Sequence, residues 1–226
     1  MSTILFLLCI IGSIIQIAFI MVERKGDMKM ALILKTVAAI FFVFAGFYCM
    51  QSCEDQTRAW YVVAGLIMGA VGDVCLNLQF LVKNKDALFI AGALAFFVGH
   101  ILYLISLIPY VKDILLVCFV ITAVIIAFLM SWVYRHANAE LGLKIFGVFY
   151  IGAVSYITVL AAGRYLLNPA SMGSLIFAIG AGLFTVSDVV LIFDTFGNKK
   201  PWMRVANLTL YYAGQLTIAI SLLFAM

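Results

Sequence analysis

Two aspartates lie inside long apolar segments, where a carboxylate is difficult to keep ionised. They are Asp73, within the stretch GDVCL, and Asp188, within the stretch SDVVL. An acidic residue in a membrane-spanning segment is costly to keep there, so it usually marks a functional site. Two carboxylates that share an apolar cavity repel each other, which favours one protonated acid beside one charged acid. Such a pair suits acid–base chemistry on an ether or acetal-like bond.

The two aspartates belong to a pattern of matches at a constant offset of 115 residues, the distance from position 73 to position 188. Chance matching between apolar sequences is the alternative explanation, but paired acids and paired glycine–polar steps at one offset favour a duplication. We therefore predict that the two acids occupy equivalent positions and serve one site. The same offset relates Gly99-His100 to Gly214-Gln215, Ser106-Leu107 to Ser221-Leu222, and Lys85 to Lys200.

The composition is typical of a protein that crosses the membrane many times. Of the 226 residues, 66% are hydrophobic and 11% are charged, and a soluble domain of this length cannot bury so much apolar surface. We predict a single transmembrane domain over residues 1–226. The net charge of +4 belongs to short loops, so it indicates contact with anionic lipid and no nucleic-acid partner. The five cysteines are odd in number and imply no disulfide framework.

Polar residues divide the chain into eight apolar spans, so the predicted fold is an all-α membrane protein with eight transmembrane helices. All three prolines are predicted to lie in the breaks between spans, where a residue without an N–H donor does least harm. The first span is read as a transmembrane helix and not as a removable signal peptide, because it lacks a basic leader and a cleavage site. The spans are residues 2–22, 30–50, 59–81, 87–108, 114–134, 141–162, 171–193 and 203–225.

Basic residues gather in alternate breaks, and this bias predicts the orientation. Three of the breaks have one basic residue each, Arg58, Lys112 and Arg164. Because short basic loops stay in the cytoplasm, we predict that both termini lie outside, N-out and C-out. Four helices per repeat is an even number, so the two repeats, about 1–111 and 112–226, should be parallel. The predicted cytoplasmic breaks and their flanks hold Arg24, Lys25, Lys29, Lys83, Lys85, Arg135, Lys144, Lys199, Lys200 and Arg204.

Helical periodicity places several polar residues on shared faces with the aspartates. Residues four apart lie on one side of a helix, as Gly65, Gly69 and Asp73 do. Those glycines would let a neighbouring helix approach closely. We predict that the polar faces converge with both aspartates on a cavity between the repeats, open toward the cytoplasm. The residues predicted to line it are Lys35, Asn77, His100, Tyr103, Asn207, Tyr211 and Gln215.

Each of these lining residues also has a simpler structural interpretation. Lys35 is near enough to a helix end to extend its ammonium group to the membrane surface. His100 is more readily a hydrogen-bonded core residue than a metal ligand, and the tyrosines and amides can pack or join helices. The sequence has only two histidines, His100 and His136, of which the second is predicted to lie in a loop. Two are too few for a three-histidine zinc site.

The familiar catalytic motifs of soluble enzymes are absent from the sequence. There is no GxSxG element, no P-loop and no dinucleotide fingerprint. No metal and no cofactor are therefore expected. The two aspartates, Asp73 and Asp188, therefore remain as the candidate catalytic groups.

The motifs around these residues resemble those of the YhhN-like lysoplasmalogenase family, over nearly the whole chain. Lys35 is similar to the lysine of that family's second helix, although Thr36 stands here where a proline usually follows. The resemblance is carried by Gly72-Asp73-x-x-Leu76, by Phe96-x-x-x-His100-x-x-Tyr103, by Gly180-Ala181-x-Leu183-Phe184-x-x-Ser187-Asp188-x-x-Leu191, and by Tyr212-x-x-Gln215 with Ser221.

The resemblance implies a multi-pass enzyme that hydrolyses the vinyl ether bond of lysoplasmalogens to a fatty aldehyde and glycerophosphoethanolamine or glycerophosphocholine. One aspartate would donate a proton to the vinyl carbon, and the other would stabilise the oxocarbenium ion and orient water. Lys35 would bind the phosphate, and the other lining residues would surround the substrate. The implied partners are a lysophospholipid substrate and membrane lipid, and the expected location is a bacterial cell membrane. The sequence does not fix which aspartate is the acid, nor the oligomeric state.

The rival interpretation is a transporter or binding protein for a lipid or small solute that contains a buried aspartate pair. Parallel repeats with acids inside the membrane also serve carriers that bind cations. A third interpretation is a relative with the same fold and a different lipid substrate, since a fold does not fix a substrate.

Overall fold

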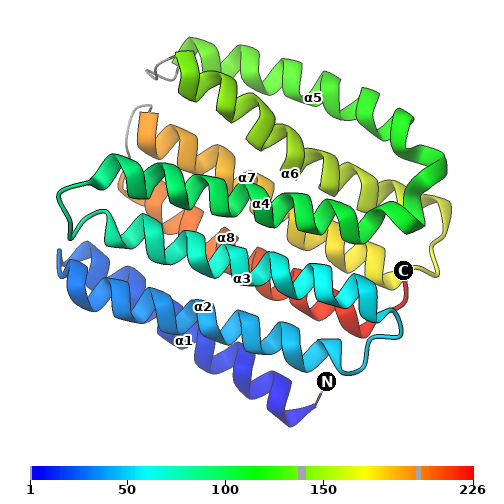
Figure 1. The fold of residues 1–226 in the computed structure, drawn as a ribbon, viewed down its shortest axis with the longest axis horizontal. Helices are drawn as coiled ribbons and strands as arrows, with labels where there is room; N and C mark the ends of the chain where they lie inside the picture. Colours follow the sequence, from blue (N-terminus) through cyan, green and yellow to red (C-terminus); the bar gives the residue numbers. More distant parts are fainter. Residues whose placement is uncertain (1, 137–140, 197–199) are drawn as a thin grey trace. The chain divides into compact units, whose positions relative to one another are not determined.

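The computed structural model describes residues 2–136, 141–196 and 200–226, and helices account for nearly all of them. Within these residues there is no strand, so the predicted all-α class is confirmed. Two short 3-10 helices, η1 (Lys112–Ile114) and η2 (Ser221–Leu223), accompany the α-helices. The α-helices, shown in Figure 1, are α1 (Thr3–Arg24), α2 (Met28–Met50), α3 (Gln56–Leu78), α4 (Lys85–Val111), α5 (Leu115–His136), α6 (Leu141–Leu167), α7 (Met172–Phe196) and α8 (Pro201–Ile220).

Side-chain caps explain why the first three helices begin where they do. Ser2 accepts a hydrogen bond from the backbone N–H of Leu5 at 3.3 Å. Asp27 and Asp55 accept equivalent bonds at the starts of α2 and α3, at 3.0 and 2.9 Å. A cap of this kind satisfies one of the N–H groups that the first helical turn leaves without a partner. Between α1 and α2, Gly26 takes a φ of +85°, a left-handed conformation that suits glycine.

The break predicted at residues 109–113 is wrong in its position. Pro109 lies inside α4, which continues to Val111, and η1 then leads directly into α5. A proline removes one N–H donor from its helix, but at membrane depth neighbouring helices tolerate this loss. His136, predicted to lie in a loop, is the last residue of α5. Lys199 and residues 137–140 lie outside the described residues.

Seven segments among the described residues are long and apolar enough to cross a membrane, which indicates an integral, multi-pass membrane protein. The fourth of these segments, Lys85–Ser131, runs through α4, η1 and most of α5, and the charged residues Lys112 and Asp113 lie at the junction of the two α-helices. The other six correspond to α1, α2, α3, α6, α7 and α8.

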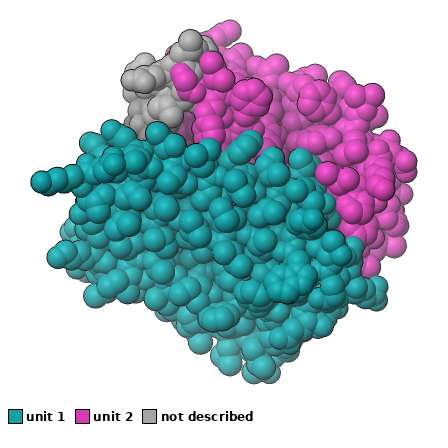
Figure 2. Space-filling model, in the orientation of Figure 1, with its two compact units in different colours: residues 1–106 teal, residues 107–226 magenta. Residues whose placement is uncertain are grey.

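The chain divides into two units, residues 1–106 and residues 107–226, which Figure 2 distinguishes by colour. The boundary falls within α4, close to the predicted repeat boundary. In the first unit, α2 packs against both α1 and α3 (Figure 1). In the second unit, successive helices from α5 to α8 pack against each other.

Glycines bring the last two helices of each unit close together. In the first unit, a Cβ atom added at Gly99 on α4 would lie 3.1 Å from the carbonyl oxygen of Gly65 on α3. In the second unit, a Cβ at Gly214 on α8 would lie 2.8 Å from the carbonyl oxygen of Gly180 on α7. Small residues allow such close helix packing in membranes. Both glycines of the second contact lie 115 residues after those of the first.

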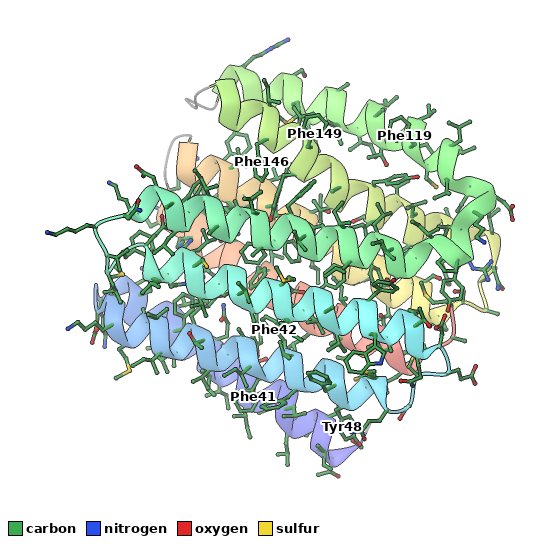
Figure 3. The ribbon with its side chains drawn as sticks, viewed as in Figure 1. Phe41, Phe42, Tyr48, Phe119, Phe146 and Phe149 are labelled. Carbon is green, nitrogen blue, oxygen red and sulfur yellow. The ribbon has the colours of Figure 1, made fainter. Side chains whose placement is uncertain are left out.

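Three of the phenylalanines labelled in Figure 3, Phe42, Phe119 and Phe149, differ widely in their exposure. Phe42 on α2 is fully buried. Phe119 on α5 and Phe149 on α6 are 59% and 65% exposed. Large exposed apolar side chains of this kind are expected where a helix contacts hydrocarbon and no water.

Candidate functional site

Asp73 forms a buried ion pair with Lys35, and both residues belong to the first unit. Lys35 projects from α2 and Asp73 from α3, and the ammonium nitrogen lies 3.3 Å from a carboxylate oxygen. Their side chains are 1% and 6% exposed. Lys35 therefore does not extend to the membrane surface, as the simpler interpretation of the sequence allowed. An unpaired charge in an apolar interior costs on the order of several kcal/mol, so each charge stabilises the other.

Phe19 on α1 makes a second contact with the same ammonium group. The nitrogen of Lys35 lies 5.2 Å from the centre of the Phe19 ring, within the range of a cation–π interaction. Gln16, one turn earlier on α1, is also buried, with 3% exposure. Three helices thus fix the position of Lys35: α2 carries it, α3 supplies the counter-ion and α1 supplies the ring.

The other predicted site residues of the first unit are all buried. The side-chain amide of Asn77 donates to the backbone carbonyl of Asp73 at 3.0 Å, one turn earlier on α3. His100 and Tyr103 on α4 are 1% and 2% exposed. The Tyr103 ring packs directly over Gly65, where a Cβ atom would collide with it. Because Gly65 has no side chain, the glycine face predicted on α3 has room for this large side chain from α4.

Asp188 lies on α7 in the second unit and is 4% exposed. Its neighbour Ser187 and Asn207 on α8 form a reciprocal set of hydrogen bonds. Asn207 donates from Nδ2 to the carbonyl oxygen of Ser187 at 3.0 Å and to its Oγ at 2.8 Å. Ser187 Oγ donates to the carbonyl oxygen of Asn207 at 3.0 Å. We call these three bonds the Ser187–Asn207 clamp, and they join α7 to α8 beside the aspartate.

Tyr211 and Gln215 continue the buried polar face of α8. Gln215 donates from Nε2 to the hydroxyl of Tyr211 at 3.4 Å, and the two side chains lie one turn apart. The Tyr211 ring meets Phe184 of α7 edge-on, with centroids 5.2 Å apart and an interplanar angle of 82°. The two residues are 5% and 1% exposed. The structure thus places both within the α7–α8 interface.

Within each unit, then, the structure brings some predicted residues into contact. Lys35 pairs with Asp73, and Asn77 bonds to the backbone of Asp73, whereas Asn207 bonds to Ser187 and Gln215 to Tyr211. In the described part of the chain, no three His, Cys, Asp or Glu side chains are grouped to hold a metal ion. The chemistry open to these clusters is that of a buried carboxylate with a fixed counter-ion and of a second buried carboxylate beside a rigid helix contact.

Comparison with known proteins identifies the family. A model of the YhhN family matches residues 28–222. The chain belongs to the YhhN family. Lys35, Asp73 and Asp188 all lie within the match, whereas α1, with Phe19, precedes it.

Curated relatives of this YhhN chain are lysoplasmalogenases from mammals. It is 31% identical over 173 residues to lysoplasmalogenase TMEM86B of Mus musculus, which covers 74% of this chain and 65% of the relative. It is 31% identical over 160 residues to TMEM86B of Homo sapiens, covering 70% and 61%. The identity to lysoplasmalogenase TMEM86A of Bos taurus is 29%, covering 80% and 72%. The chain thus spans less than two thirds of the length of the two TMEM86B proteins. No solved structure matches the chain.

Two residues of the YhhN chain that matter for these clusters, Phe19 and Ser187, were not among the predicted site residues. Phe19 lies in an apolar segment where nothing distinguishes it from other aromatic residues. Ser187 had a detectable signal, since it is a hydroxyl residue directly before a buried aspartate. Its partner, Asn207, is on the next helix, and sequence spacing alone does not show which backbone an amide side chain will meet.

Proposed function

We propose that this YhhN-family protein is a membrane hydrolase that cleaves the vinyl ether bond of lysoplasmalogens. The observation that carries the proposal is a pair of buried aspartates, Asp73 and Asp188, in a chain whose curated relatives are named lysoplasmalogenases. An acidic side chain inside a transmembrane helix costs free energy, so its presence there usually indicates a functional role. A lysophospholipid in the surrounding membrane is the proposed substrate.

We further propose that the chain forms eight transmembrane helices in two parallel four-helix repeats, with both termini outside. The equivalent glycine contacts of the two units support a duplication. So do Ser106 and Ser221, which lie at the same offset and each donate to the carbonyl three residues earlier at 2.7 Å. Two parallel repeats give the aspartates equivalent depths in the membrane.

The proposed reaction consumes one water and returns both carboxyl groups to their starting states. A protonated aspartate gives its proton to the vinyl carbon that does not bear oxygen, which leaves an oxocarbenium ion. Water adds to the cationic carbon and gives a proton to the ionised aspartate, so that a hemiacetal forms. The first carboxylate then removes the hemiacetal hydroxyl proton, while the second acid protonates the departing glycerol oxygen. The products are a fatty aldehyde and the glycerophospho-alcohol.

Purified protein incubated with a lysoplasmalogen tests the proposal, with mass spectrometry of the aldehyde and of the glycerophospho product. We expect aldehyde release by the wild type and a loss of about 100-fold or more in both Asp73→Asn and Asp188→Asn. Asp86→Asn is the matched control, because Asp86 is exposed in the first turn of α4, and it should keep full activity. Substrate that stays intact would refute the hydrolase. Lipid that crosses the membrane unchanged would support the transporter interpretation.

A further inference from the structure

The Lys35–Asp73 ion pair limits the roles that its two members can take. Both side chains are almost fully buried, and the charges lie 3.3 Å apart. In an apolar interior, protonating the aspartate would remove the negative charge that lies 3.3 Å from the ammonium group, and attraction between charges at this distance is strong where the dielectric is low. Lys35 therefore favours the charged form of Asp73 in the free protein, before any substrate binds.

The same geometry makes Lys35 a poor phosphate ligand. Its ammonium group already has a carboxylate counter-ion on one side and the face of the Phe19 ring nearby, at 5.2 Å. A phosphate that bound the same ammonium would bring its own negative charge next to Asp73. Like charges at such short range in a medium of low dielectric repel strongly.

Phe19 makes α1 a part of this site. The ring is 0% exposed, so it shields the ammonium group from water as well as contacting it. Since α1 lies before the stretch that the YhhN family model matches, this contribution comes from outside the matched region.

We infer that Lys35, covered by Phe19, is a positioning residue that keeps Asp73 ionised, and that the substrate phosphate binds elsewhere. The inference rests on the proposed hydrolase function. Asp73 is then the carboxylate that stabilises the oxocarbenium ion and accepts the proton of water, and Asp188 is the proton donor. This assignment reverses the sequence-based expectation that Lys35 binds the phosphate.

Two vinyl ethers separate a positioning role from a phosphate-binding role: a 1-alkenyl-glycerophosphoethanolamine and the corresponding 1-alkenylglycerol, which has no phosphate. We expect Lys35→Met to lower kcat by about 100-fold on both substrates and to leave each KM nearly unchanged. Lys35→Arg should recover a large part of kcat, because a guanidinium group keeps the charge. If Lys35→Met instead raises KM for the phosphate-bearing substrate alone and turns over the alkenylglycerol like the wild type, the inference is overturned.

Phe19→Leu tests the contribution of α1 separately. Removing the ring face while keeping an apolar side chain should lower kcat on both substrates by about 2- to 30-fold. Phe177→Leu is the matched control, because Phe177 on α7 is equally buried and belongs to the other unit. Equal effects of the two substitutions would show that Phe19 acts only through packing.

Stability measurements on full-length protein test the ion pair without any reference to activity. Lys35→Met should unfold more readily than Lys35→Met combined with Asp73→Asn, because the single variant leaves one buried charge without its partner. A double variant no more stable than the single would show that the pair does not hold Asp73 in its charged form. A wild type that releases no aldehyde would refute the proposed function and the catalytic assignment, while the stability comparison would still decide the charge state.

Discussion

The Ser187–Asn207 clamp gives a quantitative prediction about the second unit. Asn207→Ala removes two of the three hydrogen bonds and leaves the bond from Ser187 Oγ to the backbone of residue 207. Ser187→Ala also removes two, because its Oγ takes part in one bond as donor and in another as acceptor. With an average of about 0.6 kcal/mol for a hydrogen bond between membrane helices, each variant should lose about 1.2 kcal/mol of unfolding free energy.

The double variant distinguishes the clamp from two independent contacts. Asn207→Ala combined with Ser187→Ala removes all three bonds, so its expected loss is about 1.8 kcal/mol. That value is smaller than the sum of the single losses by about 0.6 kcal/mol, because both single variants lose the bond between Nδ2 and Oγ. Reversible unfolding in bicelles or detergent measures these differences. Thr217→Ala is a suitable control on α8, since among the described residues the Thr217 hydroxyl donates to the carbonyl of Ala213 on its own helix, at 2.7 Å, and to no other helix.

The outcome also decides the role of Asn207, which the sequence analysis assigned to substrate binding. If the amide serves the clamp, Asn207→Ala and Ser187→Ala should lower activity to a similar extent, through the position of Asp188. Strictly additive losses of stability, or an unchanged stability in Asn207→Ala, would refute the reasoning. A rise in KM confined to Asn207→Ala would restore the substrate-binding role.

Two further predictions concern packing and orientation. Gly180→Ala should destabilise the protein by about 1–3 kcal/mol, because the new Cβ would lie 2.9 Å from the carbonyl oxygen of Gly214. Gly182→Ala on the same helix should be neutral or slightly stabilising, since its nearest neighbour would be a methyl carbon of Thr158 at 3.7 Å; equal losses would refute the close contact. Compartment-sensitive reporters fused to each end should both report the outer side, and a cytoplasmic C-terminus would contradict the proposed orientation.

The helices were readable from the sequence because apolar runs and local signals set them. The acidic caps at Asp27 and Asp55 lie next to the runs that they start, so predicted and observed bounds differ by only a few residues. Pro109 was misplaced because proline is a strong break signal in water, and within a membrane protein a helix can continue past it.

The contacts within the clusters were not readable, because they depend on which helices meet. Spacing predicted the face of Asp73 on its helix. The sequence was equally compatible with a Lys35 side chain at the membrane surface and with one paired to an acid, and the packing of α2 against α3 decides for the pair. The partner of Asn207 lies 20 residues earlier in the chain, and Phe19 resembles every other aromatic residue of its segment. Local patterns identify candidates, and tertiary packing decides their partners.

Hydrolysis of a lysoplasmalogen by the purified wild type in deuterated water tests the central claim most directly. Protonation of the vinyl carbon by a carboxyl group predicts a fatty aldehyde with one deuterium on the carbon next to the carbonyl, together with a free glycerophospho-alcohol in equal amount. An aldehyde without deuterium would contradict acid catalysis at the vinyl carbon, and recovery of the intact lipid would contradict the hydrolase itself.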